Sequence, residues 1–284
     1  MVRQLIDTFG RVHRDLRISV TDRCNFRCTY CMPADGLEWL PREDLLTFEE
    51  IERVARLMVE RHGVESIRLT GGEPTVRANL PTLVGMLADL PVDLSLTTNG
   101  MTLRLVAGKL AAAGLKRINV SLDSLRADRF EELTRRNELP RVLDGIDAAI
   151  EAGLYPVKVN VVVMRGVNDD ELVDLARFGR ERGVEVRFIE FMPLDADRSW
   201  SEGAVVGQDE IVARIGEVFP LEPVDRTSAP ATRYRYVDGA GGIGVVASVT
   251  RSFCDSCDRI RLTADGQFRN CLFAVEEFDL RSML

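Results

Sequence analysis

Short runs of alternating apolar and polar residues recur along the chain, and segments with helical periodicity separate them. An alternation with a period of two predicts a strand, and six such runs precede residue 193. They cover residues 16–21, 66–70, 94–99, 117–123, 155–164 and 184–192. Apolar positions three and four apart predict helices over residues 47–63, 80–90, 103–113, 127–136, 141–152, 170–182 and 208–218. Strands and helices that alternate in this way predict an α/β fold, an incomplete (βα)6 barrel with a parallel sheet.

One face of these predicted strands is repeatedly polar. A strand that is buried on both faces usually reads as a continuous apolar run. Here polar residues alternate with apolar ones, and they include Arg17, Arg68, Thr97, Ser121 and Lys158. If helices cover the apolar face, the polar face must line an inner cavity, where each unpaired polar group would cost about 1–3 kcal/mol. We therefore expect a polar ligand or water inside the barrel; a solvated sheet face is the alternative interpretation.

Length and composition indicate a globular protein with one barrel-sized domain and a small extension. The chain has 284 residues, of which 45% are hydrophobic, and it contains no long apolar run and no signal-like N-terminus. We therefore expect a cytoplasmic protein that binds no membrane. Strand-like segments at 234–237 and 243–248 lie around a Gly-rich turn. We divide the chain into a partial barrel, residues 1–220, and a C-terminal extension, residues 221–284.

The charge and the glycine pattern limit the class of ligand. The formal charge of −8 argues against nucleic acid as a partner, because proteins that bind nucleic acid usually carry a basic surface. An anionic substrate would have to meet a local basic pocket instead. The chain contains no G-x-x-x-x-G-K-[ST] sequence, so a nucleotide would not be held by a Walker-type loop.

Six cysteines fall into two groups of three, which indicates two metal centres. The groups are Cys24, Cys28 and Cys31, directly after the first predicted strand, and Cys254, Cys257 and Cys271. In a reducing compartment such cysteines are metal ligands or catalytic groups rather than disulfides. A structural zinc site needs four protein ligands, whereas three thiolates can hold three corners of a [4Fe–4S] cluster and leave one iron open. Two [4Fe–4S] clusters are therefore the favoured interpretation, and zinc sites are the alternative.

The first cysteine group resembles the signature of the radical S-adenosylmethionine (SAM) superfamily, C-x3-C-x-aromatic-C, with Tyr30 as the aromatic residue. The sequence Gly71-Gly72-Glu73-Pro74 resembles the GGEP element of the same superfamily. The resemblance implies that SAM chelates the open iron of the first cluster. It also implies contacts with SAM at Tyr30, Gly72, Ser121 and Met192.

Further motifs narrow the resemblance to the GTP 3′,8-cyclase family of molybdenum-cofactor biosynthesis. The motifs are LTGGEP, TTNG, NVSLDSL, FMPL, FCDSCDRIRLTADG and NCLF, and the similarity runs from about Arg11 to the end of the chain. It implies a radical SAM barrel with a second [4Fe–4S] cluster in a small C-terminal extension, and GTP between the two clusters. GTP contacts are then expected at Arg17, Arg68, Thr97, Lys158, Arg259, Ile260 and Arg261, with Arg259 and Arg261 as the catalytic pair near the base.

The resemblance also implies the reaction and the partners. The product would be (8S)-3′,8-cyclo-7,8-dihydroguanosine 5′-triphosphate, formed in the first step of molybdopterin synthesis. An external electron donor and a downstream cyclic pyranopterin synthase would be partners, and a homodimer stays open. Two rival functions remain: a peptide-modifying radical SAM enzyme with an auxiliary cluster, and a non-catalytic iron–sulfur or zinc protein.

The end of the chain departs from the family pattern. Family members end in a tail with two terminal glycines, whereas this chain stops at Leu284 within a segment, residues 276–284, that reads as helical. We expect a tail of about forty residues to be missing, because the apolar pattern ends without a helix cap. A chain of this length is expected to fold and bind its ligands but to turn over poorly.

Overall fold

A twelve-stranded sheet runs through the computed structural model, which describes residues 3–194, 200–224 and 229–284. Its centre consists of the six predicted strands in chain order: β1 (Asp15–Ser19), β2 (Ser66–Thr70), β3 (Asp93–Thr98), β4 (Arg117–Ser121), β5 (Val157–Val163) and β6 (Glu185–Glu190). Neighbouring strands in this set are parallel. The strands β1 and β6 do not pair with each other, so the sheet stays open. The prediction of an α/β fold with an incomplete barrel is confirmed.

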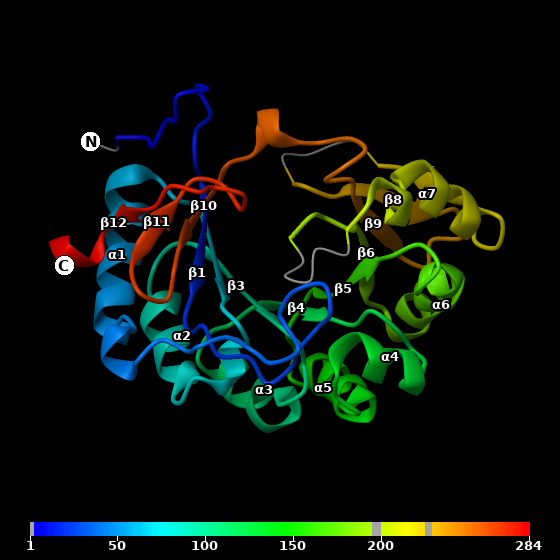
Figure 1. Ribbon diagram of the computed structural model, residues 1–284, viewed down its shortest axis with the longest axis horizontal. Coiled ribbons are helices and arrows are strands. Elements are labelled where there is room, and N and C mark those ends of the chain that lie inside the picture. The colour runs from blue at the N-terminus through cyan, green and yellow to red at the C-terminus, as the bar shows by residue number, and fades with distance from the viewer. Residues whose placement is uncertain (1–2, 195–199, 225–228) are drawn as a thin grey trace.

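Seven helices lie along the outer side of the curved sheet in the part of the chain that the structure describes (Figure 1). They are α1 (Phe48–His62), α2 (Leu80–Ala88), α3 (Leu103–Ala112), α4 (Ala127–Thr134), α5 (Leu139–Glu151), α6 (Leu172–Arg182) and α7 (Gln208–Gly216). The first begins with the expected capping box, in which Thr47 and Glu50 each accept a hydrogen bond from the other's backbone N–H. Gly63 ends it in the left-handed conformation, at a φ of 74°. Among these described helices, none combines the length and the apolar character that a membrane span requires.

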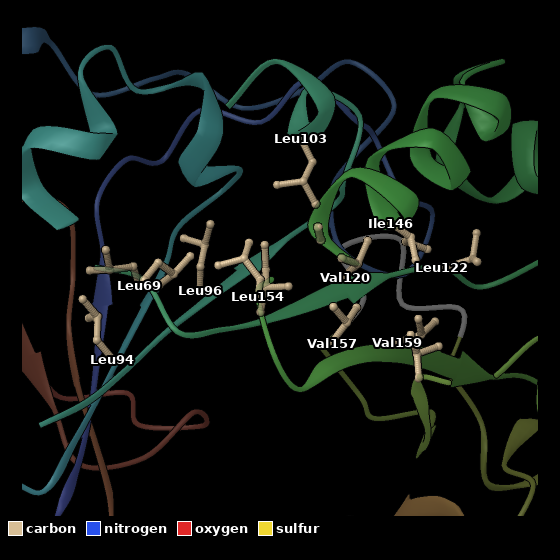
Figure 2. Packing of buried hydrophobic residues seen from close by; sticks show 14 of the residues in the cluster. Leu69, Leu94, Leu96, Leu103, Val120, Leu122, Ile146, Leu154, Val157 and Val159 are labelled. Atoms are coloured by element: carbon tan, nitrogen blue, oxygen red, sulfur yellow. The ribbon is translucent and has the colours of Figure 1, made fainter. Parts of the chain in front are cut away.

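The apolar face of each strand packs against the helices. Figure 2 shows Leu103 of α3 and Ile146 of α5 close to Val120 of β4, and all three side chains are fully buried. Leu69 and Leu96 continue the same layer on β2 and β3. Because successive side chains of a strand point to opposite faces, the polar residues between these apolar ones point into the arc. The alternation in the sequence therefore has the physical cause that was predicted for it.

The C-terminal segment extends the central sheet at both of its edges. The strands β7 (Leu221–Pro223), β8 (Thr232–Tyr236) and β9 (Gly242–Val246) follow β6, and β9 pairs with it in parallel. The strands β10 (Arg259–Leu262), β11 (Gln267–Arg269) and β12 (Phe278–Asp279) continue outward from β1. The connection from β9 to β10 crosses the open side of the arc (Figure 1). The sheet continues across residue 220, and the division of the chain at this residue stays a prediction.

The prediction of a helical pattern over residues 276–284 is wrong. The structure has the short strand β12 there, followed by a single 3-10 turn at Arg281–Met283. Phe278 pairs with Phe268 in an antiparallel ladder, and the backbone N–H of Leu280 donates to the carbonyl of Gly266 over 3.1 Å. Because this pairing with β11 uses the backbone groups that a helix would need, the apolar spacing does not produce a helix.

Candidate functional site

The first cysteine loop, residues 24–31, follows β1 at the carboxyl ends of the parallel strands. The loop is supported by the glycine pair after β2. The N–H of Gly72 donates to the carbonyl of Thr21 over 2.8 Å, and the N–H of Glu73 donates to that of Arg23, also over 2.8 Å. A Cβ atom on Gly72 would lie 2.4 Å from the carbonyl oxygen of Arg23. Only glycine fits there, because two backbone segments meet directly.

The buried carboxylate of Glu73 connects this support to the end of β3. It accepts hydrogen bonds from the Thr98 hydroxyl and the Asn99 N–H, both at 2.6 Å, and from the Thr75 N–H at 3.0 Å. Burial raises the pKa of Glu73, and these hydrogen bonds oppose the rise. The side-chain amide of Asn99 in turn donates to Asn25 of the first cysteine loop over 2.7 Å. The GGEP and TTNG motifs therefore hold the loop together.

The end of α4 holds the other side of the first cysteine loop. The guanidinium of Arg135 donates to the carbonyls of Arg27 at 2.9 Å and Met32 at 3.1 Å. Arg136 donates to the carbonyl of Asn25 over 3.0 Å. These bonds satisfy backbone carbonyls that an irregular loop would otherwise leave unpaired. The protein alone therefore defines the path of the loop.

Tyr30, the expected aromatic contact of SAM, is fixed by a buried carboxylate. Its hydroxyl donates to one Asp123 oxygen over 2.6 Å, and the other oxygen accepts from the Val162 N–H over 2.8 Å. Burial raises the pKa of Asp123 to about 6 and raises that of Tyr30 well above its ordinary value. Ser121, at the end of β4, precedes Asp123 by two residues. The loop, β4 and β5 therefore meet at this pair.

The thiols of the first loop fit an iron–sulfur cluster. All three are free cysteines, and burial is the largest cause of the raised pKa values of Cys24, Cys28 and Cys31. Thiolates in such surroundings need a nearby positive charge, which cluster irons supply. Three thiols on one loop also leave one corner of a [4Fe–4S] cluster without a protein ligand. The donor set therefore matches the cluster that the signature implies.

The second cysteine group faces a cavity of about 200 Å³ on the inner side of the sheet. Six arginines line this space, which we call the arginine cavity: Arg11, Arg17, Arg68, Arg187, Arg259 and Arg261. Cys254, Cys257, Cys271 and Met192 line it as well. The three thiols belong to free cysteines, the donor type that the expected second cluster would need, and binding of that cluster stays a prediction. The arginine cavity thus brings predicted cluster ligands, GTP contacts and a SAM contact to one place.

Strand register explains why the arginines converge. Arg17 on β1 is the Cα partner of Arg68 on β2 and of Arg261 on β10. Partners at the same level of a sheet point to the same face, so the three guanidinium groups form a row. Arg259 lies two residues before Arg261 and shares its face. It donates from Nε to the Cys257 thiol over 3.2 Å.

The row carries more positive charge than its surroundings balance. Burial lowers the pKa of Arg68 to about 9 and that of Arg261 to about 10, and the charge of Arg17 is the next cause in both. Among the residues that the structure describes, the buried Nε of Arg17 has no hydrogen-bond partner. Buried cations without matching anions favour the binding of an anionic ligand.

Three expected GTP contacts lie outside the arginine cavity. Lys158 lines a neighbouring cavity of about 670 Å³, and its ammonium nitrogen lies 3.7 Å from the Glu185 carboxylate. The Thr97 hydroxyl accepts a hydrogen bond from Asn119 over 3.2 Å. The Ile260 side chain is buried in the hydrophobic core, so only its backbone could meet a ligand. Their roles toward GTP stay predictions.

Two of the six arginines in the cavity, Arg187 and Arg11, were not predicted from the sequence. Arg187 alternates with buried Val186 and Phe188 on β6, so the rule that identified Arg17 would also have found it. Arg11 belongs to the N-terminal segment, where its guanidinium donates to the carbonyl of Cys254 over 2.7 Å. No periodicity or spacing pointed to Arg11, because this contact joins residues at opposite ends of the chain.

Comparisons with known proteins agree with this geometry. Residues 18–179 match the family model of the radical SAM superfamily, and residues 184–284 match the model of Molybdenum Cofactor Synthesis C. The chain resembles solved radical SAM structures, among them SuiB of Streptococcus suis bound to S-adenosylmethionine, with a TM-score of 0.66 and 13% identity over 95% of this chain and 64% of that one. The structure of anSMEcpe with bound AdoMet has a TM-score of 0.64 and 14% identity over 95% and 76%. At such identities these likenesses show the fold alone.

Sequence relatives are much more similar. A protein of Streptomyces coelicolor, named GTP 3′,8-cyclase, is 53% identical over 285 residues, which cover 99% of this chain and 84% of the relative. A protein of the same name from Rhodopirellula baltica is 53% identical over 99% of this chain and 80% of its own length. The first family model covers the first cysteine group and the second model covers the second, whereas each relative matches nearly the whole chain. The chain belongs to the GTP 3′,8-cyclase family of the radical SAM superfamily.

Proposed function

We infer that this protein is a radical SAM enzyme that joins C3′ of the ribose of GTP to C8 of its guanine. The product is (8S)-3′,8-cyclo-7,8-dihydroguanosine 5′-triphosphate, an intermediate of molybdenum-cofactor biosynthesis. One observation carries the substrate assignment: the row of Arg68, Arg17 and Arg261 beside the second cysteine group. A cavity lined by six arginines suits a nucleoside triphosphate, because the phosphates need several cationic partners.

The first cysteine loop holds the cofactor side of the site. Cys24, Cys28 and Cys31 would bind a [4Fe–4S] cluster, and Tyr30, Gly72, Ser121 and Met192 would contact SAM. When bound, the cluster and SAM supply the radical chemistry that a protein side chain cannot provide. Met192 also lines the arginine cavity, so an expected SAM contact borders the space assigned to GTP. This continuity supports direct transfer of hydrogen from the ribose.

The second cysteine group would hold a second [4Fe–4S] cluster through Cys254, Cys257 and Cys271. Arg259 and Arg261 lie beside this group, and we assign them to the guanine end of the substrate. The other arginines of the cavity would bind the phosphates through charge-assisted hydrogen bonds. In this assignment the protein orients the ribose and keeps water away from it. An external electron donor and a cyclic pyranopterin synthase would act before and after this enzyme.

The test is anaerobic turnover with SAM, GTP and a reductant. We expect about eight iron and eight sulfide per chain after reconstitution. We also expect methionine, 5′-deoxyadenosine and the cyclised nucleotide as products, with deuterium transferred from C3′ of labelled GTP to 5′-deoxyadenosine. A peptide-modifying enzyme would form no cyclised nucleotide and transfer no deuterium from GTP, and zinc without sulfide would indicate a non-catalytic protein.

A further inference from the structure

The carboxylate of Glu185, at the start of β6, is surrounded by three cations. One of its oxygens accepts a hydrogen bond from Nε of Arg187 at 2.6 Å and lies 3.7 Å from the Lys158 ammonium. The other lies 3.5 Å from the guanidinium of Arg233. The Glu185 side chain is only 15% exposed. Burial alone would raise its pKa, but the three cations keep the pKa below its ordinary value, so the group is ionised.

Glu185 pairs with residues of two cavities. Its partner Arg187 lines the arginine cavity, whereas Lys158, Arg233 and Glu185 itself line the neighbouring cavity of about 670 Å³. On the neighbouring strand β9, Gly244 is the Cα partner of Arg187. A Cβ atom on Gly244 would lie 3.2 Å from Cγ of Arg187 and 3.7 Å from the Glu185 carboxylate. The sheet therefore leaves space for this ion pair.

The cationic groups that surround Glu185 are of the kind that binds a phosphate group. A carboxylate among two guanidinium groups and an ammonium group has the surroundings of a bound phosphate. One negative charge leaves this cluster with an excess of positive charge, which a dianionic phosphate would balance better. A phosphate that reaches Arg187 would therefore meet a cation that Glu185 already partly neutralises.

We propose that Glu185 is an internal competitor of the terminal phosphate of the substrate and thereby sets the affinity for nucleoside triphosphates. It orients Arg187 and Lys158 in the free enzyme, and its negative charge weakens the binding of the phosphate chain. The inference rests on the proposed function, in which GTP occupies the arginine cavity with its guanine toward the second cysteine group. Arg187 lies on β6, several strands away from Arg259 and Arg261 on β10, so a phosphate chain that extends away from the guanine end would bring its terminal phosphate to Arg187. The competition would then grow with the number of phosphates.

The test is the variant Glu185→Gln, which keeps an acceptor for Nε of Arg187 but removes the charge. Dissociation constants for GTP, GDP and GMP are measured by equilibrium dialysis on the reconstituted holoenzyme without reductant. We expect GTP to bind about five- to tenfold tighter, GDP to gain less, and GMP to change by less than about twofold.

The matched control is Glu222→Gln, which makes the same change in net charge on β7. Glu222 is 47% exposed and pairs with Arg235. This control is expected to change all three affinities by less than about twofold, because exposed charges are screened. Equal gains in the two variants, a gain that does not depend on phosphate number, or weaker GTP binding by Glu185→Gln would overturn the proposal.

A second variant keeps the proposal testable if Glu185→Gln loses its iron or its fold. Arg233→Gln changes a side chain that is 52% exposed and leaves Glu185 less neutralised. We expect GTP to bind about threefold weaker and GMP to be unaffected; unchanged or tighter GTP binding would contradict the role of Glu185. If the wild-type enzyme binds no GTP, the proposed function fails and the inference fails with it. If the wild type binds GTP and Glu185→Gln behaves like Glu222→Gln, only the inference fails.

Discussion

The two cysteine groups carry three thiols each, but the protein holds them differently. The first lies on one short loop that β2, β3 and the end of α4 fix through backbone and side-chain hydrogen bonds. In the second group, Cys254 and Cys257 lie on the connection between β9 and β10, whereas Cys271 follows β11. Cys254 and Cys271 are exposed, as is Cys31 of the first loop. The connection between β9 and β10 contacts β6 and the N-terminal segment. The Glu190 carboxylate accepts from the N–H groups of Val249 and Thr250, each at 2.8 Å, and Arg11 binds the carbonyl of Cys254.

This difference indicates a division of work between the two groups. A loop that many hydrogen bonds within the protein hold suits a cofactor whose geometry must be the same in every turnover. A more open group beside a row of buried arginines suits the binding and release of an anionic substrate. The comparison predicts that substitutions in the first loop stop radical formation. Substitutions near the second group should affect only the conversion of GTP to product.

The largest effect is expected from the cysteines themselves. Cys28→Ala should abolish SAM cleavage under all conditions, because it removes a ligand of the cluster that binds SAM. Cys257→Ala should abolish cyclisation but retain SAM cleavage in the absence of GTP. Each variant should lose about four of eight irons, one cluster's share. SAM cleavage measured as 5′-deoxyadenosine, together with iron analysis, checks both variants; loss of SAM cleavage in Cys257→Ala would remove the distinction between the two groups.

A change in the support of the first loop should come next. Gly72→Ala places a methyl group 2.4 Å from a backbone oxygen, so the loop must shift. We expect the free energy of unfolding to fall by roughly 1–3 kcal/mol and the first cluster to be lost while the second remains. Denaturant unfolding and iron analysis measure these effects.

The control for this prediction is Gly108→Ala on α3, where an added Cβ atom meets no atom within 4 Å. Alanine in the interior of an exposed helix should stabilise it by roughly 0.5–1 kcal/mol. Equal behaviour of the two glycine variants would mean that the close backbone approach does not support the loop.

A substitution of Arg261 tests the role of the second cysteine group without the loss of a thiol. It is the better choice than Arg259, which touches the Cys257 thiol and would affect the cluster directly. Arg261→Ala should lower formation of the cyclised nucleotide by about a hundredfold, because the substrate loses its placement, and should leave uncoupled SAM cleavage intact. Product analysis by mass spectrometry measures both. Arg251→Ala, a change at an exposed arginine paired with Asp209, should have no such effect.

The smallest effect concerns pH and Lys158, which lies at neither cysteine group. Burial, with a contribution from Arg187, lowers the pKa of Lys158 to about 8. Lys158 is cationic below this value and neutral above it, so GTP affinity should fall by about threefold as the pH rises from 7 to 9. Lys158→Arg should flatten this dependence, because arginine stays protonated. A dependence that is the same in wild type and variant would exclude Lys158 as its cause.

The sequence by itself determined the local structure, the inward-facing arginines of two strands and the first cysteine loop. The capping box at Thr47, the left-handed glycine at the end of α1 and the period-two strands depend on neighbouring residues, so they could be read directly. The same alternation assigned Arg17 and Arg68 to the inner face, because side-chain direction on a strand is a local property. The three-residue spacing in the first cysteine loop was sufficient to predict a cluster site.

Only the tertiary structure decided how the ends of the chain complete the site. Arg17 and Arg261 are register partners although they lie near opposite ends of the chain, and β9 and β10 attach to opposite edges of the central sheet. Arg11 donates a hydrogen bond to the carbonyl of Cys254, and Glu185 lies beside cations of β5, β6 and β8. No spacing in the sequence predicts these contacts. The helical reading of residues 276–284 failed because pairing with β11 outweighed the local pattern. Strand pairing and burial act between residues that are distant in the chain, so they become visible only when the chain is folded.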